Sequence, residues 1–216
     1  MPQSHFRVAI PPQQLEADLR MPPRPKGVVI FAHGSGSSRL SPRNRAVAEA
    51  LVEAGFATLL LDLLTEPEAS ERANVFDIEL LSGRLLDAVD WVGGEPDLAG
   101  LPIGLFGAST GAAAALRAAA SRPDRIAAVV SRGGRPDLAG DALDRVQAPT
   151  LLIIGGHDEV VLGLNHDAMQ RIGGLCRLEV VPGATHLFEE PGALEQVTRL
   201  AADWFSRQLA PAAVGA

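Results

Sequence analysis

The chain has 216 residues, of which 47% are hydrophobic and 21% are charged. This length fits one domain, and the apolar content excludes a disordered or low-complexity chain because it can build a large core. The formal net charge of -7 leaves no surplus of basic residues to neutralise a phosphate backbone or an anionic membrane. We therefore expect no nucleic-acid partner and no membrane partner.

The single cysteine, Cys176, cannot form an internal disulfide bond. Residues 1–20 lack the basic start and the apolar run of a secretory signal. The longest apolar runs are as short as strands, so we expect no segment to span a membrane. These features predict a cytoplasmic protein.

Short apolar runs recur along the chain with helical stretches between them. The first two, at 6–10 and 15–21, alternate between apolar and polar residues and predict an antiparallel hairpin at a sheet edge. Six further strands are expected at 27–32, 57–63, 102–106, 126–130, 150–154 and 178–181. Because several of these runs are apolar throughout, they indicate an α/β protein with a mostly parallel central sheet and helices on both faces.

Helices are predicted between these strands. Ser41 and Pro42 favour a helix start, and the helix should end before Gly55. Further helices are expected at 74–92, with Phe76 and Trp91 in its apolar stripe, at 110–121, at 161–172 and at 192–209, with one short helix at most within 136–147. No repeat or linker divides the chain, so 1–209 should form a single domain followed by a flexible tail at 210–216.

The predicted strand that ends at residue 106 runs directly into the sequence GASTG at 107–111 and then into an alanine-rich helix. This is the G-x-S-x-G pattern in a strand-turn-helix context, where a tight turn raises the serine hydroxyl above the sheet. We therefore take Ser109 as the candidate nucleophile. The alternative is a glycine-rich turn that only permits close packing.

A serine nucleophile needs an imidazole base and usually a carboxylate behind that base. Asp158 follows the strand at 150–154, and His186 follows the strand at 178–181. Because the carboxyl ends of parallel strands meet at one sheet edge, we expect both side chains to converge on the serine. Glu159 is a second carboxylate that could take the role of Asp158, and His186 could instead be a hydrogen-bonded loop histidine.

Acyl transfer also requires hydrogen-bond donors for the oxyanion. The candidates are the backbone amides of Thr110, just after the serine, and of Ser35, in the glycine- and serine-rich loop after residue 32. Gly34 in this loop is a candidate substrate contact, and His33 more simply orders the loop. A phosphate cradle is disfavoured because the loop lacks the P-loop pattern, and no motif with metal-ligand spacing predicts a metal.

Two arginines follow the predicted strand at 126–130 and therefore approach the same sheet edge. Arg132 and Arg135 are candidate anchors for a substrate carboxylate, which a guanidinium can hold bidentately. The alternative is an ion pair with an acid of the same loop, such as Asp137 or Asp141.

The sequence HGSG at 33–36, the elbow at 107–111, Asp158 and His186 together resemble the α/β-hydrolase superfamily. The compact chain is similar to its dienelactone hydrolase branch, and the resemblance covers nearly the whole length and implies minimal or no cap domain. Dienelactone hydrolases proper carry cysteine in the elbow, where this chain has Ser109. Some related bacterial sequences fuse such a segment to a phosphoribosyltransferase, and we expect no second domain of this kind here.

The resemblance implies a serine hydrolase that cleaves small carboxylic esters through an acyl-enzyme, with no metal and no organic cofactor. Short-chain esters are expected because the sequence offers little material to cover a long chain. The alternatives are a lactone or thioester hydrolase, a perhydrolase that uses the same three residues, and a non-catalytic binding protein of the same fold. A homodimer, which could cover the site, is also left open.

Overall fold

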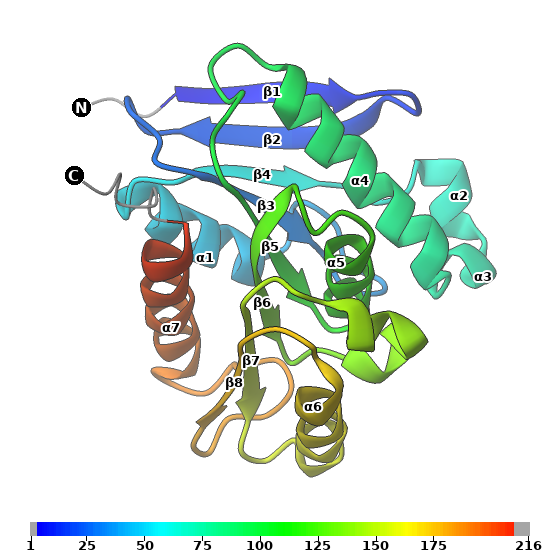
Figure 1. The fold of residues 1–216 in the computed structure, drawn as a ribbon, viewed down its shortest axis with the longest axis vertical. Coiled ribbons are helices and arrows are strands. Elements are labelled where there is room, and N and C mark those ends of the chain that lie inside the picture. Colours follow the sequence, from blue (N-terminus) through cyan, green and yellow to red (C-terminus); the bar gives the residue numbers. More distant parts are fainter. Residues whose placement is uncertain (1–3, 210–216) are drawn as a thin grey trace.

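A computed structural model describes residues 4–209 of the chain, and an eight-stranded sheet runs through them (Figure 1). The strands are β1 (Ser4–Ile10), β2 (Leu15–Met21), β3 (Val28–Ala32), β4 (Ala57–Leu61), β5 (Ile103–Ala108), β6 (Ile126–Arg132), β7 (Thr150–Gly155) and β8 (Cys176–Val181). Their order in the sheet is β1-β2-β4-β3-β5-β6-β7-β8. The β1–β2 and β2–β4 pairs are antiparallel and the others are parallel, so the predicted edge hairpin is confirmed.

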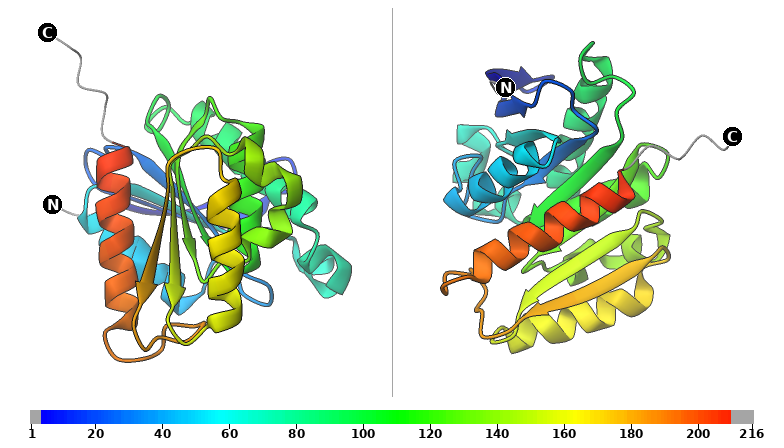
Figure 2. Two further views of the ribbon diagram at one scale, coloured as in Figure 1. Left: turned by 60° about the horizontal axis from the view of Figure 1, so that its bottom comes forward. Right: turned by 90° about the vertical axis from the view of Figure 1, so that its left-hand side faces the viewer.

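Helices cover both faces of this sheet, as predicted. They are α1 (Pro42–Glu53), α2 (Glu66–Ser70), α3 (Arg72–Val75), α4 (Ile78–Gly94), α5 (Thr110–Ser121), α6 (Glu159–Arg171) and α7 (Ala193–Gln208), with a 3₁₀ segment η1 at Pro136–Arg145. Helices α1 and α7 lie on one face, and α4, α5 and α6 lie on the other (Figure 2).

The central strands show why the sheet is covered on both sides. All five residues of β3 are buried. Val28 and Ile30 pack toward α4 and α5, whereas Val29 and Phe31 pack toward α1 and α7. Because successive side chains of a strand point to opposite faces, an uninterrupted apolar strand requires an apolar layer on each side.

The prediction of one continuous helix at 74–92 was wrong at its start, because the structure has two separate helices there. α3 ends at Val75, and α4 begins after Asp77, whose carboxylate accepts a hydrogen bond from the Leu80 amide at 3.0 Å. An aspartate in this N-cap position favours a new helix start. Phe76 therefore lies between the helices and is 49% exposed, instead of joining the apolar stripe.

Several strand ends also differ from the prediction. β6 continues through Ser131 to Arg132, which pairs with Ile153 of β7, and β8 begins at Cys176. The paired part of β6 therefore includes the polar residues Ser131 and Arg132, which lie at the carboxyl end of this strand. The predicted tail at 210–216 lies outside the described residues.

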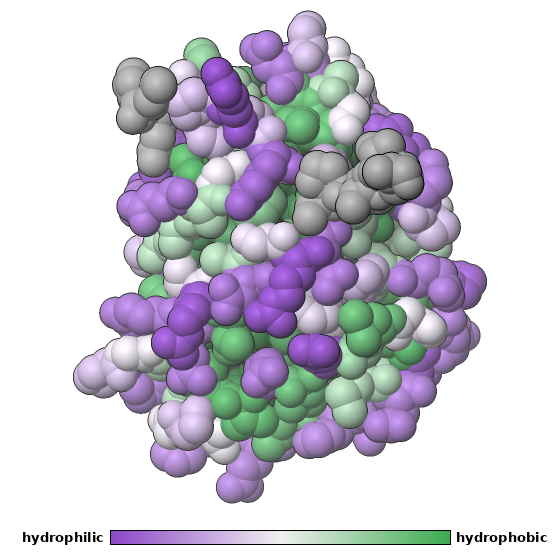
Figure 3. Space-filling model, turned by 60° about the vertical axis from the view of Figure 1, so that its left-hand side comes forward, coloured by the Kyte–Doolittle hydropathy of each residue, from purple (hydrophilic) through white to green (hydrophobic). Residues whose placement is uncertain are grey.

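On the face shown in Figure 3, hydrophilic side chains alternate with patches of apolar ones. Near the edge strand β8, Leu175 is 51% exposed and Val180 is 38% exposed. An edge strand of this kind can pair with a second chain, and the homodimer stays a prediction. Within residues 4–209, no helix has the length and apolar character needed to cross a bilayer.

Candidate active site

Ser109 lies on a sharp turn between β5 and α5, with a φ of 51° and a ψ of -121°. A positive φ is unfavourable for a residue that has a side chain, and it marks the strained strand-to-helix elbow. Both glycines of the motif, Gly107 and Gly111, are required because neither position has room for a side chain. A Cβ at Gly107 would collide with the backbone of Ala112, and a Cβ at Gly111 would collide with the backbone oxygen of Ala32.

The imidazole of His186 is held by a carboxylate. Its Nδ1 lies 2.6 Å from Oδ2 of Asp158, which is the residue between β7 and α6. The Asp158 side chain is only 15% exposed, so little water competes for the carboxylate. Glu159, the alternative acid, is exposed in the first turn of α6. Asp158 is therefore the acid that contacts the imidazole.

The serine and the histidine both lie against the end of β6 and the turn that follows it. The Ser109 amide donates to the Arg132 carbonyl at 3.2 Å, and the Arg135 amide donates to the Ser109 carbonyl at 3.1 Å. Between these two residues, a Cβ at Gly133 would lie 3.6 Å from Cε1 of His186. The elbow and the imidazole therefore lie on either side of one short turn.

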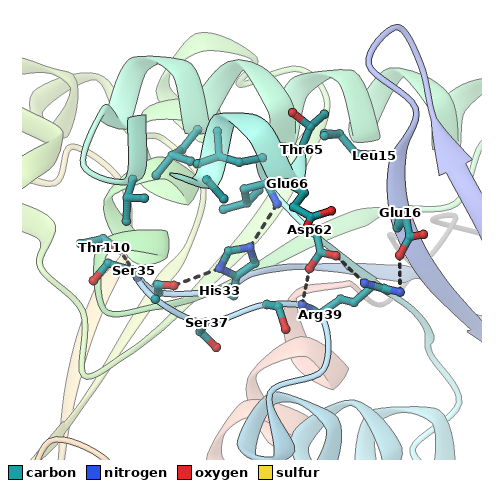
Figure 4. A pocket seen from close by; sticks show the side chains of 18 of the residues that line it. Leu15, Glu16, His33, Ser35, Ser37, Arg39, Asp62, Thr65, Glu66 and Thr110 are labelled. Atoms are coloured by element: carbon teal, nitrogen blue, oxygen red, sulfur yellow. Dashed lines mark hydrogen bonds and ion pairs between the residues drawn. The ribbon is translucent and has the colours of Figure 1, made fainter. Parts of the chain in front are cut away.

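The two expected oxyanion residues also meet. The Ser35 amide donates to Oγ1 of Thr110 at 2.8 Å, so the hydroxyl holds the loop after β3 against the start of α5 (Figure 4). The Thr110 amide is the first of the helix, where an N–H has no intrahelical acceptor. Gly34 lies against the nucleophile, because a Cβ there would be 3.1 Å from Cβ of Ser109.

His33 orders this loop, which confirms the simpler interpretation of that residue. Its Nε2 accepts from the Leu63 amide at 3.1 Å, so Nδ1 carries the proton and donates to the Gly34 carbonyl at 3.0 Å. Burial lowers the pKa of His33, which keeps the ring neutral. The ring links the loop after β3 to the loop after β4.

The two arginines differ in their surroundings. The guanidinium of Arg135 donates from Nε and from an Nη to the carboxylate of Asp137, at 2.9 and 2.8 Å, as the ion-pair alternative predicted. Arg132 is 8% exposed and forms no ion pair within residues 4–209. Burial, and secondarily the charge of Arg43, lower the pKa of Arg132 to about 10. Of these two arginines, Arg132 is therefore the one whose guanidinium has no carboxylate partner among residues 4–209.

A cavity of about 510 Å³ opens beside the loop after β3. Its walls come from that loop, the β1–β2 turn, the α2–α3 segment and α4 (Figure 4). These residues are not predictable as a site from the sequence, because no helix was expected at α2 and because leucines such as Leu15 and Leu64 look like core residues. No local sequence signal marks such a cavity.

No group of three or more His, Cys, Asp or Glu side chains within 4–209 is arranged to hold a metal ion. Cys176 lies at the start of β8, and burial raises the pKa of its thiol to about 11. A thiol of this kind is a poor nucleophile at neutral pH.

The mostly parallel sheet with its serine elbow defines the class of the α/β hydrolases. Within that class, the chain belongs to the dienelactone hydrolase family, whose model matches residues 15–210. A solved structure of dienelactone hydrolase from Anabaena variabilis is similar to this chain with 52% identity and a TM-score of 0.91, covering 96% of this chain and 98% of that one.

Two further relatives extend the comparison. A protein of Mycobacterium tuberculosis called a putative phosphoribosyl transferase is 63% identical over 199 residues, which are 92% of this chain but 45% of that protein. The chain therefore spans less than half of the length of this relative. Est1E from Butyrivibrio proteoclasticus, at 20% identity and a TM-score of 0.77 over 94% of this chain and 98% of its own, shares the fold.

Proposed function

We propose that the protein is a serine hydrolase that cleaves carboxylic esters through an acyl-enzyme intermediate. The observation that carries the proposal is the contact of 2.6 Å between His186 and Asp158, at the same sheet edge as the strained Ser109 elbow. A serine hydrolase of this kind needs a nucleophilic serine, an imidazole base and a carboxylate behind that base. Several solved structures that share the fold bear esterase names, among them carboxyl esterase 2 from Tuber melanosporum.

In the proposed reaction, Nε2 of His186 takes the proton of Ser109 as Oγ attacks the ester carbonyl carbon. The carbonyl oxygen becomes an oxyanion that accepts a hydrogen bond from the Thr110 amide, and a second one from the Ser35 amide once that N–H leaves Oγ1 of Thr110. Asp158 stabilises the imidazolium, which then gives its proton to the leaving alcohol. Water activated by the same imidazole releases the carboxylic acid and restores the serine hydroxyl.

The name of the Mycobacterium tuberculosis relative describes a protein more than half of which lies outside the segment that matches this chain, so it carries no phosphoribosyl transfer to this chain. The residues discussed above support hydrolysis, because a nucleophilic serine elbow and an Asp–His pair serve acyl transfer.

The test is hydrolysis of p-nitrophenyl esters from acetate to laurate by the wild type and by Ser109→Ala. The proposal expects activity in the wild type and loss of at least about a thousandfold in the variant, because the covalent step is removed. Equal rates for both proteins would overturn it. A lactone and a thioester in the same assay, and peroxide with a carboxylic acid, compare the alternatives that share the three residues.

Arg132 is proposed as a substrate contact because its buried guanidinium is free of ion pairs within the described residues. Arg135 is a weaker choice, since Asp137 already occupies its guanidinium. If Arg132 binds a substrate carboxylate, Arg132→Ala should lower the hydrolysis of esters with an anionic leaving group more than that of neutral esters. An equal loss for both kinds of ester would remove Arg132 from the substrate site.

A further inference from the structure

We infer that the cavity beside the loop after β3 holds the acyl half of the ester, and that it favours acyl groups without a negative charge. This inference rests on the proposed function. The cavity is next to the reaction centre, since Gly34, Ser35 and Thr110 line one end of it and Gly34 lies against Ser109.

The position of His186 decides which half of the ester enters the cavity. The leaving alcohol must lie beside the imidazole that protonates it. None of the residues that line the cavity belongs to the segment 182–192 that carries His186. The cavity instead adjoins the proposed oxyanion donors, which bind the carbonyl group. The acyl chain is bonded to the carbonyl carbon and extends away from the imidazole, so it is the half of the ester that enters the cavity.

The cavity is large enough for more than a short acyl chain. Its volume of about 510 Å³ lies within the range of small-molecule sites. Apolar side chains from four separate elements or loops form much of its wall, among them Leu15, Leu64, Val75 and Leu81. The α2–α3 segment supplies the covering that the sequence did not predict. We therefore expect medium-length acyl chains to be better substrates than acetate.

The charges around the cavity disfavour an anion. Three carboxylates line it, those of Glu16, Asp62 and Glu66, against a single guanidinium, that of Arg39. Arg39 is already paired with Glu16 and Asp62, and its amide donates to Oδ1 of Asp62 at 2.7 Å (Figure 4). No unpaired cation of the lining is left to receive a carboxylate. The negative charges of the lining carboxylates repel a carboxylate of the substrate, so an anionic acyl group should bind poorly.

Glu66 is the carboxylate best suited to test this charge effect. It is exposed in the first turn of α2, whereas Glu16 and Asp62 are tied to Arg39. Glu71, which follows α2, is equally exposed but does not line the cavity. The same substitution at the two positions changes the net charge equally and changes the cavity only at Glu66.

The charge test compares p-nitrophenyl pentanoate with mono-p-nitrophenyl glutarate, two acyl groups of equal length that end in a methyl and in a carboxylate. We expect kcat/KM to favour the pentanoate by about tenfold or more in the wild type. Glu66→Lys should shrink that preference several-fold, and Glu71→Lys should leave it unchanged. A wild-type preference near unity, or an equal change in both variants, would overturn the inference.

The size test uses two neighbouring positions of α2. Ala69 lines the cavity and is exposed toward it, whereas Ser70 is exposed outside the lining. Neither α2 nor α3 has a buried residue, so a tryptophan at either position displaces no core side chain. Ala69→Trp should lower the octanoate-to-acetate ratio of kcat/KM by about tenfold, and Ser70→Trp should not. A ratio unchanged by Ala69→Trp would contradict an acyl cavity here.

A binding measurement separates this inference from the proposed function. Octanamide is neutral, carries the same chain and needs no catalysis to be observed by saturation-transfer NMR. The inference predicts binding to the wild type, to Ser109→Ala and to Ser70→Trp, with loss in Ala69→Trp. If no ester is hydrolysed but this binding pattern holds, the esterase proposal fails and the cavity remains a neutral acyl site. Absence of octanamide binding in every protein would overturn the cavity assignment.

Discussion

Ser109 adopts a backbone conformation that costs about 1–3 kcal/mol in a residue other than glycine. The surrounding contacts hold it there. Its amide donates to Arg132 at the end of β6, its carbonyl accepts from Arg135 in the turn that follows, and its neighbours Gly107 and Gly111 allow β5, α5 and β3 to approach closely. These contacts maintain the strained conformation of Ser109.

Asp158→Asn tests whether the carboxylate of Asp158 supports catalysis by His186. The amide is neutral and cannot stabilise the imidazolium, so we expect kcat to fall by about 10³-fold or more while the fold is retained. Ester hydrolysis and a thermal melt check both parts. Glu159→Gln is the matched control and should keep its activity, because Glu159 is exposed outside the His186 contact. The reverse pattern would identify Glu159 as the acid.

The hydroxyl of Thr110 positions the Ser35 amide, because it accepts that amide's hydrogen bond at 2.8 Å. Thr110→Val keeps the side-chain shape but removes the acceptor, and should lower kcat by about tenfold with little change in KM. Thr110→Ser keeps an acceptor and should recover most of the rate. Equal activity in Thr110→Val and the wild type would show that the hydroxyl does not position the oxyanion donor.

His33 makes the stability of the fold depend on pH. Burial holds its pKa below the ordinary value of 6.5, so below about pH 6.5 the unfolded chain binds this proton before the folded chain does. Its contribution is therefore complete above that pH and falls as the solution becomes more acidic. His33→Gln should lose this share of the dependence in urea unfolding at pH 7 and pH 5. An identical pH dependence in both proteins would contradict the assignment.

At the scale of the elements, helix α5 is packed unusually close to β3 because Gly111 has no side chain. A Cβ there would meet the backbone oxygens of Ala32 and His33, which cannot move without disturbing the sheet and the loop after it. The elbow and the oxyanion loop are therefore joined by backbone packing as well as by the Ser35–Thr110 hydrogen bond.

Gly111→Ala should destabilise the fold by roughly 1–3 kcal/mol or more, because of this overpacking. Gly83→Ala is the matched control, since Gly83 lies within α4 and a Cβ there meets nothing within 4 Å. The control should stabilise the fold by about 0.5–1 kcal/mol, because alanine favours the helix. Urea unfolding measures both. A Gly111→Ala protein as stable as the wild type would rule out the close approach of α5 and β3.

The α2–α3 segment shows where prediction from sequence failed among the elements. Helix α4 begins after Asp77 because the short side chain of this residue caps the helix. Helices α2 and α3 before it have no buried residue, so their sequence lacks the periodic apolar positions that would predict a helix. The segment is held instead by polar contacts, such as the one of 2.6 Å between Arg84 and Glu68. Contacts between residues so far apart leave no local pattern, so the wall of the cavity could not be predicted.

For the molecule as a whole, the sheet and the contact between Asp158 and His186 were predictable from the sequence. Apolar strands indicated two covered faces, and the GASTG motif and the positions of Asp158 and His186 after their strands placed these groups at one edge. The pairing of Arg135 with Asp137, the isolation of Arg132 and the charges of the cavity depend on tertiary contacts. From the sequence, the roles of the two arginines stayed open, and no cavity was predicted.

The most direct test of the account is labelling by an organophosphonate ester, followed by peptide mass spectrometry. The phosphonate reports the nucleophile without requiring the natural substrate. The account predicts one adduct on Ser109 in the wild type, and greatly slowed labelling in His186→Ala, where the base is missing. An unlabelled wild type that folds normally, or an adduct on another residue, would contradict a serine nucleophile at this elbow and favour a binding protein of the same fold.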